Sequence, residues 1–213
     1  MPEFEILPVF PSVISATRLE SDLTEFWKNI ENLEFFPSTA DDTHLVFSSR
    51  NMKILESYLE LKKILLDTFY DFKNQTLKLH TTDFDITTSW ITKTDPEGFC
   101  QYHCHRNSYY SGVLYNSKTN QPDSGNLLFT DVGIKEETIL INQPTEWNIL
   151  NSRRIVIEPD ENLLVFFPSS LRHRINRYTG LTPRYSLAFN IFPIGNLGNG
   201  DSFLDLNNLG KSV

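Results

Sequence analysis

Three of the five histidines in the sequence stand where they could bind a metal ion together. His103 and His105 flank a single residue, and His173 follows much further along the chain. Neutral imidazole nitrogens are good ligands for iron, zinc, copper and nickel. In a later β-rich run, the planar guanidinium of Arg184 could bind a carboxylate through two hydrogen bonds. The residue types therefore indicate a metal site with an anion-binding group beside it.

These patterns also have more ordinary explanations. A single buried histidine is more often hydrogen-bonded within a core, and a buried arginine is more often paired with one of the 27 acidic residues. A zinc site is a further alternative, although its four ligands would stand closer together than the usual separated pairs: Cys100, His103, Cys104 and His105. Ser186 alternates with Arg184 on one face of a strand, so its hydroxyl could bind the same anion.

Composition and charge exclude several classes of protein. Of the 213 residues, 39% are hydrophobic and 13% aromatic, which suits a packed globular domain. A net charge of −8 argues against nucleic-acid binding, since phosphate contacts need a basic face. No apolar run approaches the roughly 18 residues of a membrane span, and the first residues lack the basic region of a signal peptide. Two cysteines beside the histidines fit a reducing compartment, so we expect a cytoplasmic protein.

The elements that must position these residues change in type along the chain. Residues 4–16 are predicted to be an extended arm, and apolar residues at helical spacing predict helices over 19–33 and 51–73. A polar loop is expected from Pro37 to Asp42. From Leu77 onward, runs rich in β-branched and aromatic residues predict strands. We expect these strands at 77–80, 84–93, 99–104, 110–116, 126–130, 137–141, 146–149, 153–157, 162–167, 172–177 and 184–192.

Helices first and many strands later predict a mainly β protein with N-terminal helices and a double-stranded β-helix (jelly-roll) core. We expect one domain over residues 1–213. Residues 1–76 would be the N-terminal arm and supporting helices, residues 77–193 the double-stranded β-helix, and residues 194–213 a tail that is mobile or lies on the surface. The N-terminal arm or a flat sheet edge could mediate a homodimer, and the sequence does not distinguish a dimer from a monomer.

Several short motifs occur in a fixed order along nearly the whole chain. They are Leu7-Pro8-Val9-Phe10-Pro11, His103-x-His105-x-x-Ser108, Ser111-Gly112-Val113-Leu114-Tyr115, Gly125-Asn126-Leu127-Leu128-Phe129-x-Asp131, Phe166-Phe167-Pro168-Ser169-x-Leu171-x-His173 and Arg184-x-Ser186-x-x-x-Asn190. Each motif is weak alone, whereas their order and spacing together are specific. In the order and spacing of these motifs, the sequence resembles the 2-oxoglutarate/Fe(II)-dependent oxygenases, and within them a largely uncharacterised family.

The resemblance implies Fe(II) and the co-substrate 2-oxoglutarate, held inside a double-stranded β-helix. By that implication His173 is the distal iron ligand. Arg184 and Ser186 would bind the remote carboxylate of 2-oxoglutarate, with Tyr115 as a further candidate. The implied reaction uses O2 and couples oxidative decarboxylation of 2-oxoglutarate to oxidation of an unidentified peptide or small molecule, as in a hydroxylase. We expect this substrate to enter over the loops 116–126 and 142–153.

One position departs from the pattern of the superfamily. Its members usually supply His-x-Asp/Glu and a distal histidine, whereas His105 stands at the acidic position here. Either His103, His105 and His173 all bind iron, or one of the pair binds and water or a carboxylate such as Asp131 completes the set.

The alternative function is a cupin-like metal-binding protein: an isomerase, a dioxygenase that does not use 2-oxoglutarate, or a non-catalytic binding module. That alternative leaves Arg184 and Ser186 unexplained. A third class is an interaction protein whose metal site has degenerated, and the unusual His105 keeps this class open.

Overall fold

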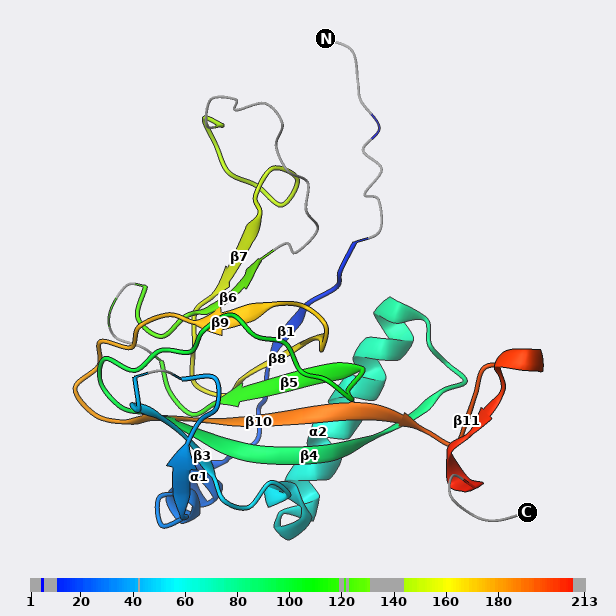
Figure 1. Ribbon diagram of the computed structural model, residues 1–213, viewed down its shortest axis with the longest axis horizontal. Helices are drawn as coiled ribbons and strands as arrows, with labels where there is room; N and C mark the ends of the chain where they lie inside the picture. The colour runs from blue at the N-terminus through cyan, green and yellow to red at the C-terminus, as the bar shows by residue number, and fades with distance from the viewer. Residues whose placement is uncertain are drawn as a thin grey trace.

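Two antiparallel sheets form the body of the protein in the computed structural model, which describes residues 5, 11–41, 43–118, 121, 123–130 and 144–208 (Figure 1). In spatial order, the larger sheet contains β1 (Ser15–Arg18), β8 (Leu163–Pro168), β5 (Tyr110–Tyr115), β10 (Arg184–Ile194), β4 (Asp83–Thr94), β3 (Val46–Ser49) and β2 (Phe35–Pro37). The smaller sheet contains β7 (Arg154–Ile157), β6 (Leu127–Thr130) and β9 (His173–Ile175).

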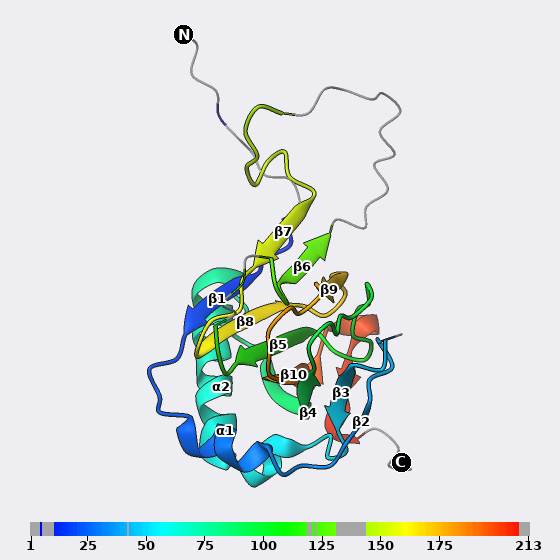
Figure 2. The ribbon, with the colours of Figure 1, turned by 90° about the vertical axis from the view of Figure 1, so that its left-hand side faces the viewer.

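Helices cover one face of the larger sheet (Figure 2). They are α1 (Thr24–Ile30) and α2 (Leu59–Phe72), with a 3-10 turn η1 (Ile54–Ser57) before α2 and a π-helical turn η2 (Lys73–Leu77) after it. The buried residues of α2 recur at the spacing of one helical face, which packs on the sheet: Leu61, Leu65, Phe69 and Phe72. The other face of the larger sheet packs on the smaller sheet through a second apolar cluster, to which Val113, Val165 and Phe129 contribute.

Alternation along β10 separates the apolar core from the interior of the barrel. Leu187 and Phe189 are fully buried on the face that packs against the helices. Arg184, Ser186 and Asn190 lie on the opposite face and line a cavity between the sheets. One strand therefore supplies both part of the core and part of a polar site.

A β-bulge in β4 changes which of its residues face the cavity. The register with β10 shifts at Thr87, which has no partner on that strand. Ile86 before the bulge and Ile91 after it both pack toward the helices, although an odd number of positions separates them. Because the bulge reverses the alternation, Trp90 and Thr92 line the cavity.

A buried carboxylate holds the segment that closes one side of the cavity. Asp41 accepts hydrogen bonds from the backbone N–H of Thr43 at 2.7 Å and from those of Leu45 and Val46 at 2.8 Å. Burial opposes ionisation of this carboxyl, but these bonds outweigh it and hold the pKa of Asp41 below its ordinary value. Ser38 and Ala40, in the same segment, line the cavity.

Seven of the predicted strands are confirmed within a few residues, as β4, β5, β6, β7, β8, β9 and β10. Three others are wrong. Leu77 is the last residue of the π-helical turn, Lys78 after it is in the left-handed region, and residues 77–80 form no strand. Residues 99–104 make only an isolated bridge, between His103 and His173. Residues 146–149 form a turn in which the side-chain oxygen of Asn148 accepts a hydrogen bond from the backbone N–H of Leu150. The predicted strand 137–141 lies outside the described residues.

Both predicted helices are shorter than their apolar patterns. The first covers only Thr24–Ile30, and the second is interrupted at Tyr58, whose backbone angles (φ −134°, ψ 63°) are not helical. Sequence patterns also missed the short strands β2 and β3, and β2 occupies the start of the predicted polar loop. Short edge strands depend on pairing with distant residues, so local composition indicates them poorly.

The two ends of the chain add minor elements. Part of the predicted N-terminal arm is strand β1, which pairs with β8. In the tail, β11 (Asn196–Leu197) pairs with β12 (Leu204–Asp205), and two short turns flank β12, η3 (Gly200–Ser202) and η4 (Leu206–Asn208). Over the described parts of the chain, no helix has the length and apolar character needed to cross a membrane.

Candidate metal centre

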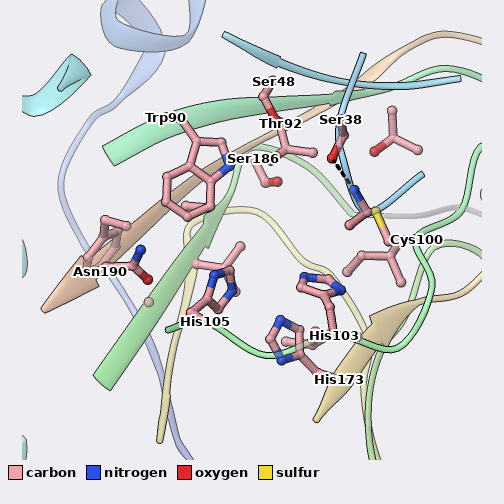
Figure 3. Close-up of a pocket in the computed structure, with 18 of the residues that line it drawn as sticks. Ser38, Ser48, Trp90, Thr92, Cys100, His103, His105, His173, Ser186 and Asn190 are labelled. Atoms are coloured by element: carbon pink, nitrogen blue, oxygen red, sulfur yellow. Dashed lines mark hydrogen bonds between the residues drawn. The ribbon is translucent and has the colours of Figure 1, made fainter. Parts of the chain in front are cut away.

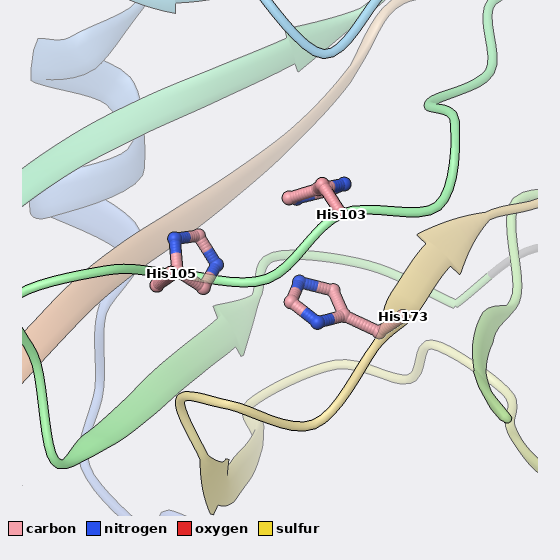
Figure 4. Close-up of side chains that lie close together, drawn as sticks. All are labelled: His103, His105 and His173. Atoms are coloured by element: carbon pink, nitrogen blue, oxygen red, sulfur yellow. The ribbon is translucent and has the colours of Figure 1, made fainter. Parts of the chain in front are cut away.

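The three histidines singled out in the sequence meet at one place in the barrel (Figure 4). One ring nitrogen from each of His103, His105 and His173 lies within 4.8 Å of the others. The bridge between the loop and β9 brings them together, because the backbones of His103 and His173 exchange hydrogen bonds of 2.9 and 3.0 Å. The backbone N–H of His105 donates to Ser169 O at 2.9 Å, which anchors the third imidazole.

Backbone carbonyls set the ring orientation of two of the imidazoles. His103 Nδ1 lies 2.8 Å from Gln101 O, and His173 Nδ1 lies 2.9 Å from Leu171 O. A carbonyl only accepts, so each Nδ1 must carry the hydrogen and each Nε2 keeps its lone pair. This arrangement is typical of metal-ligating histidines, in which the second ring nitrogen is held by an outer partner.

The surroundings keep two of these imidazoles neutral. Burial, and then the nearby His103, lower the pKa of His105 to about 4. Burial and the same neighbour lower the pKa of His173 to about 3, although its bond to Leu171 O acts in the opposite direction. Neutral imidazole is the form that binds a metal, so at neutral pH no proton needs to leave either residue.

Neither cysteine joins this group of potential ligands, so the alternative zinc site is not formed in the described structure. Cys104 is exposed, and burial raises the pKa of the Cys100 thiol to about 12, which keeps it protonated. Asp131, the proposed acidic substitute, lies outside the described residues. So do residues 7–10 of the opening motif and parts of the two loops expected to admit substrate.

The arginine predicted to bind an anion is buried without an acidic partner. Arg184 is 3% exposed, and its Nη1 donates to Gly125 O at 2.6 Å. Its guanidinium also lies over the rings of Tyr115 and Tyr178, at 5.6 and 5.3 Å from their centroids. Its Nε has no partner, and no described carboxylate pairs with it. Burial lowers the pKa of Arg184, yet a guanidinium stays charged in proteins, so this cation has no counter-ion among the described residues.

Two further residues predicted to bind the co-substrate stand beside Arg184. Ser186 and Tyr115 are opposite each other in the β10–β5 register, and both line the same cavity as Arg184. Tyr115 is 1% exposed, and its hydroxyl has no hydrogen-bond partner. Burial raises the pKa of Tyr115 to about 12, although Arg184 acts in the opposite direction, so the phenol keeps its proton and can donate. These groups can accommodate a carboxylate that the described protein does not itself provide.

Gly125 allows Arg184 to reach this position, a role that sequence reasoning missed. A Cβ at Gly125 would lie 2.4 Å from Arg184 Nη1, and its φ of +63° is unfavourable for other residues. We expect Gly125→Ala to displace the guanidinium and weaken 2-oxoglutarate binding by about tenfold, from roughly 1–2 kcal/mol of strain. Isothermal titration calorimetry of the metal-loaded protein measures this. Gly195→Ala is the matched control, because Gly195 has φ +77° with nothing within 4 Å. An equal loss of 2-oxoglutarate affinity in Gly125→Ala and Gly195→Ala would contradict a specific effect on Arg184.

The cavity that joins these groups has a volume of about 500 Å³ (Figure 3). The three histidines lie along it together with Arg184 and Ser186, so a metal ion and an anion could share one cavity. Trp90, Thr88 and Asn190 line another part of it, and sequence analysis assigned them no role. The position of Asn190 could have been predicted, because it continues the alternation of Arg184 and Ser186 along one strand. The positions of Thr88 and Trp90 could not, because the bulge in β4 reverses the alternation on which such a prediction rests.

The sheets form a double-stranded β-helix in which the three converging imidazoles could hold a metal ion. A family model described as "Putative 2OG-Fe(II) oxygenase" matches residues 88–190, from β4 to β10. This match and the shared fold confirm the resemblance to the 2-oxoglutarate/Fe(II)-dependent oxygenases that was drawn from the motifs. No curated protein sequence matches the chain.

Solved structures share the jelly-roll fold at low sequence identity. HygX from Streptomyces hygroscopicus, with nickel, 2-oxoglutarate and hygromycin B bound, has a TM-score of 0.58 at 12% identity, covering 85% of this chain and 83% of its own. A prolyl-4-hydroxylase from Pseudomonas putida has a TM-score of 0.53 at 20% identity, and the match covers 83% of this chain and 91% of that protein. A prolyl hydroxylase from Trichoplax adhaerens, in complex with a hypoxia inducible factor peptide, has a TM-score of 0.57 at 14% identity, and the match covers 84% of this chain and 83% of that protein.

Proposed function

We propose that the protein hydroxylates an organic substrate with Fe(II) held by three histidines and 2-oxoglutarate held by Arg184. In this assignment His103, His105 and His173 are the metal ligands. Arg184, Ser186 and Tyr115 bind the remote carboxylate of 2-oxoglutarate. The observation that carries the proposal is the buried guanidinium, which has no counter-ion among the described residues, in the same cavity as the three imidazoles.

The donor set supports a metal ion in an open site. Three nitrogen ligands on one side of an ion leave positions for a chelating co-substrate and for O2, as in other non-haem iron centres. An imidazole from His105 replaces the usual carboxylate, so all three protein ligands are neutral and the ion keeps its full charge. A dianionic co-substrate would compensate that charge.

The cavity on the Arg184 side supports a carboxylate ligand. Two parallel N–H donors of a guanidinium match a carboxylate, and the hydroxyls of Tyr115 and Ser186 can add two more hydrogen bonds. Without such a ligand, the buried Tyr115 hydroxyl and the Arg184 Nε remain unsatisfied, at a cost of about 1–3 kcal/mol each.

When bound, Fe(II) would activate O2, one oxygen atom of which would oxidise 2-oxoglutarate to succinate and carbon dioxide while the other would oxidise a substrate C–H bond. The residues of this chain orient and enclose these groups. The carbonyls of Gln101 and Leu171 hold two imidazoles in place, and Phe167 and Phe129 pack around His173, with ring centroids 4.7 and 5.9 Å from that imidazole. This apolar packing keeps water away from the metal ligands.

Visible absorption tests the proposal. Anaerobic addition of Fe(II) and 2-oxoglutarate is expected to give the weak charge-transfer band of a chelate, and later addition of O2 should convert 2-oxoglutarate to succinate. Metal binding without any 2-oxoglutarate dependence would favour the cupin-like alternative. A protein that binds no metal would fit the degenerate class.

A further inference from the structure

A second part of the cavity lies away from Arg184 and presents a row of polar groups. Asn190 pairs with Thr88 on β4 and with Ser111 on β5, so the three residues cross the sheet side by side. Six positions of β10, roughly 20 Å of extended strand, separate Asn190 from Arg184. This exceeds the length of a five-carbon acid, so a co-substrate bound at Arg184 leaves the Asn190 end free.

Hydrogen bonds orient the Asn190 amide without using all of it. Its Oδ1 accepts the Ser111 hydroxyl at 2.9 Å, and its Nδ2 donates to Thr88 Oγ1 at 2.9 Å. Behind Ser111, hydroxyls continue the chain at 2.8 Å each, through the buried Ser169 to the half-buried Ser108. An amide nitrogen carries two hydrogens, and the second has no acceptor among the described residues. With the amide reversed, Ser111 would accept one hydrogen and Thr88 would donate to the oxygen, so one N–H would still be free.

The surroundings of Asn190 offer donors and an apolar surface. The Thr88 oxygen already accepts a bond, so its hydroxyl can donate, and the indole N–H of Trp90 has no acceptor in the described structure. The Trp90 ring lies 5.7 Å from the His105 ring, and Figure 3 shows Trp90 and Asn190 together on the side of the cavity next to His105. Among the described residues lining the cavity there is no aspartate, glutamate or lysine.

We propose that Asn190 determines substrate specificity by donating a hydrogen bond to the carbonyl oxygen of an uncharged amide, which packs on Trp90 beside the metal. This inference rests on the proposed function. A carbonyl suits the site better than a hydroxyl, because a carbonyl only accepts whereas a hydroxyl also needs an acceptor. A charged group would enter without an opposite charge on this side, at a large cost in desolvation.

The test measures binding of matched probes to protein loaded with Zn(II) and 2-oxoglutarate, in which no turnover occurs. The probes are N-acetylglycine methylamide, which is neutral, N-acetylglycine, which is an anion, and glycine methylamide, which is a cation. The readout is the NMR signal of the Trp90 indole N–H, assigned with Trp90→Phe. We expect the neutral probe to bind at least about fivefold more tightly than either charged probe, the value of one hydrogen bond. Equal affinities, or tighter binding of methyl glucoside than of the neutral amide, would overturn the inference.

Asn190→Asp separates a role in specificity from a role in folding. The carboxylate can still accept hydrogen bonds from Ser111 and Thr88, but it has no N–H and adds a negative charge. We expect affinity for the neutral probe to fall about fivefold and preference to shift to glycine methylamide. Asn29→Asp makes the same change at an exposed residue of α1 that does not line the cavity, so it is the matched control and should change neither the affinity for the neutral probe nor the order of preference. An unchanged order of probe affinities in Asn190→Asp would refute the assignment.

The charge-transfer band of the Fe(II) and 2-oxoglutarate complex distinguishes the two ways of failing; it is measured anaerobically on metal-free portions of the same preparations, which receive Fe(II) in place of Zn(II). If the wild-type protein lacks the band, the proposed function is wrong. If the band forms but the probes are not discriminated, only the assignment of Asn190 is wrong.

Discussion

Replacing Arg184 with alanine is expected to weaken 2-oxoglutarate binding by about a hundredfold while leaving Fe(II) affinity nearly unchanged. Hydrogen bonds to a charged group contribute about 1.5–3 kcal/mol, and two of them would be lost here together with the counter-charge. The metal ligands are unaffected, because no contact joins Arg184 to the histidines. Calorimetric titration of 2-oxoglutarate into the metal-loaded protein, with a separate Fe(II) titration, measures both quantities.

Two variants make this expectation specific. Arg184→Lys keeps the charge but lacks the planar pair of donors, so its affinity should fall between those of the wild type and Arg184→Ala. Arg177→Ala removes a half-exposed arginine that pairs with Glu97 at 3.0 Å, and it should bind 2-oxoglutarate normally. Wild-type affinity in Arg184→Ala would mean that the buried guanidinium has only a structural role. Circular dichroism must show that each variant remains folded.

Removal of any one of the three histidines is expected to lower Fe(II) affinity by on the order of a hundredfold or more. Even outer partners of ligating histidines change metal affinity about 10- to 100-fold, so loss of a direct ligand should cost at least that much. The variants are His103→Ala, His105→Ala and His173→Ala. Competition with a chelator gives the affinities, and metal analysis gives the stoichiometry.

Comparison among these variants decides how many imidazoles bind. Comparable losses in all three would establish a three-histidine site, whereas full binding in His103→Ala would leave two histidines and an unidentified third ligand. His105→Asp recreates the His-x-Asp arrangement usual in the superfamily and should retain one metal ion per chain. His80→Ala changes an exposed histidine outside the site and serves as the control.

Residue types and spacings were enough to predict much of the site. The order of the motifs predicted that His103, His105 and His173 would meet, and the structure brings them together. Period-two alternation placed Arg184 and Ser186 on one face of a strand, as observed. These predictions succeed because alternation and helical periodicity follow from backbone geometry within one element. The same reasoning predicted the mainly β fold and the buried face of α2.

Other features could not be predicted from local patterns. Residues 99–104 have the composition of a strand, yet a loop there lets His103 and His105 reach one point rather than follow a regular pleat. The bulge at Thr87 reverses the alternation of β4, and only pairing with β10 reveals it. The break at Tyr58 likewise interrupts an apolar pattern that is continuous in sequence.

By itself, then, the sequence determined which side chains could bind a metal and an acid, and in which type of element most of them stand. Tertiary structure alone decided that Arg184 is buried with no carboxylate partner in the described part of the chain, and that one N–H of Asn190 has no acceptor there. The reason is physical. Burial and hydrogen-bond satisfaction depend on groups distant in sequence, and the free energy of leaving a polar group unpaired arises only once those groups have excluded water.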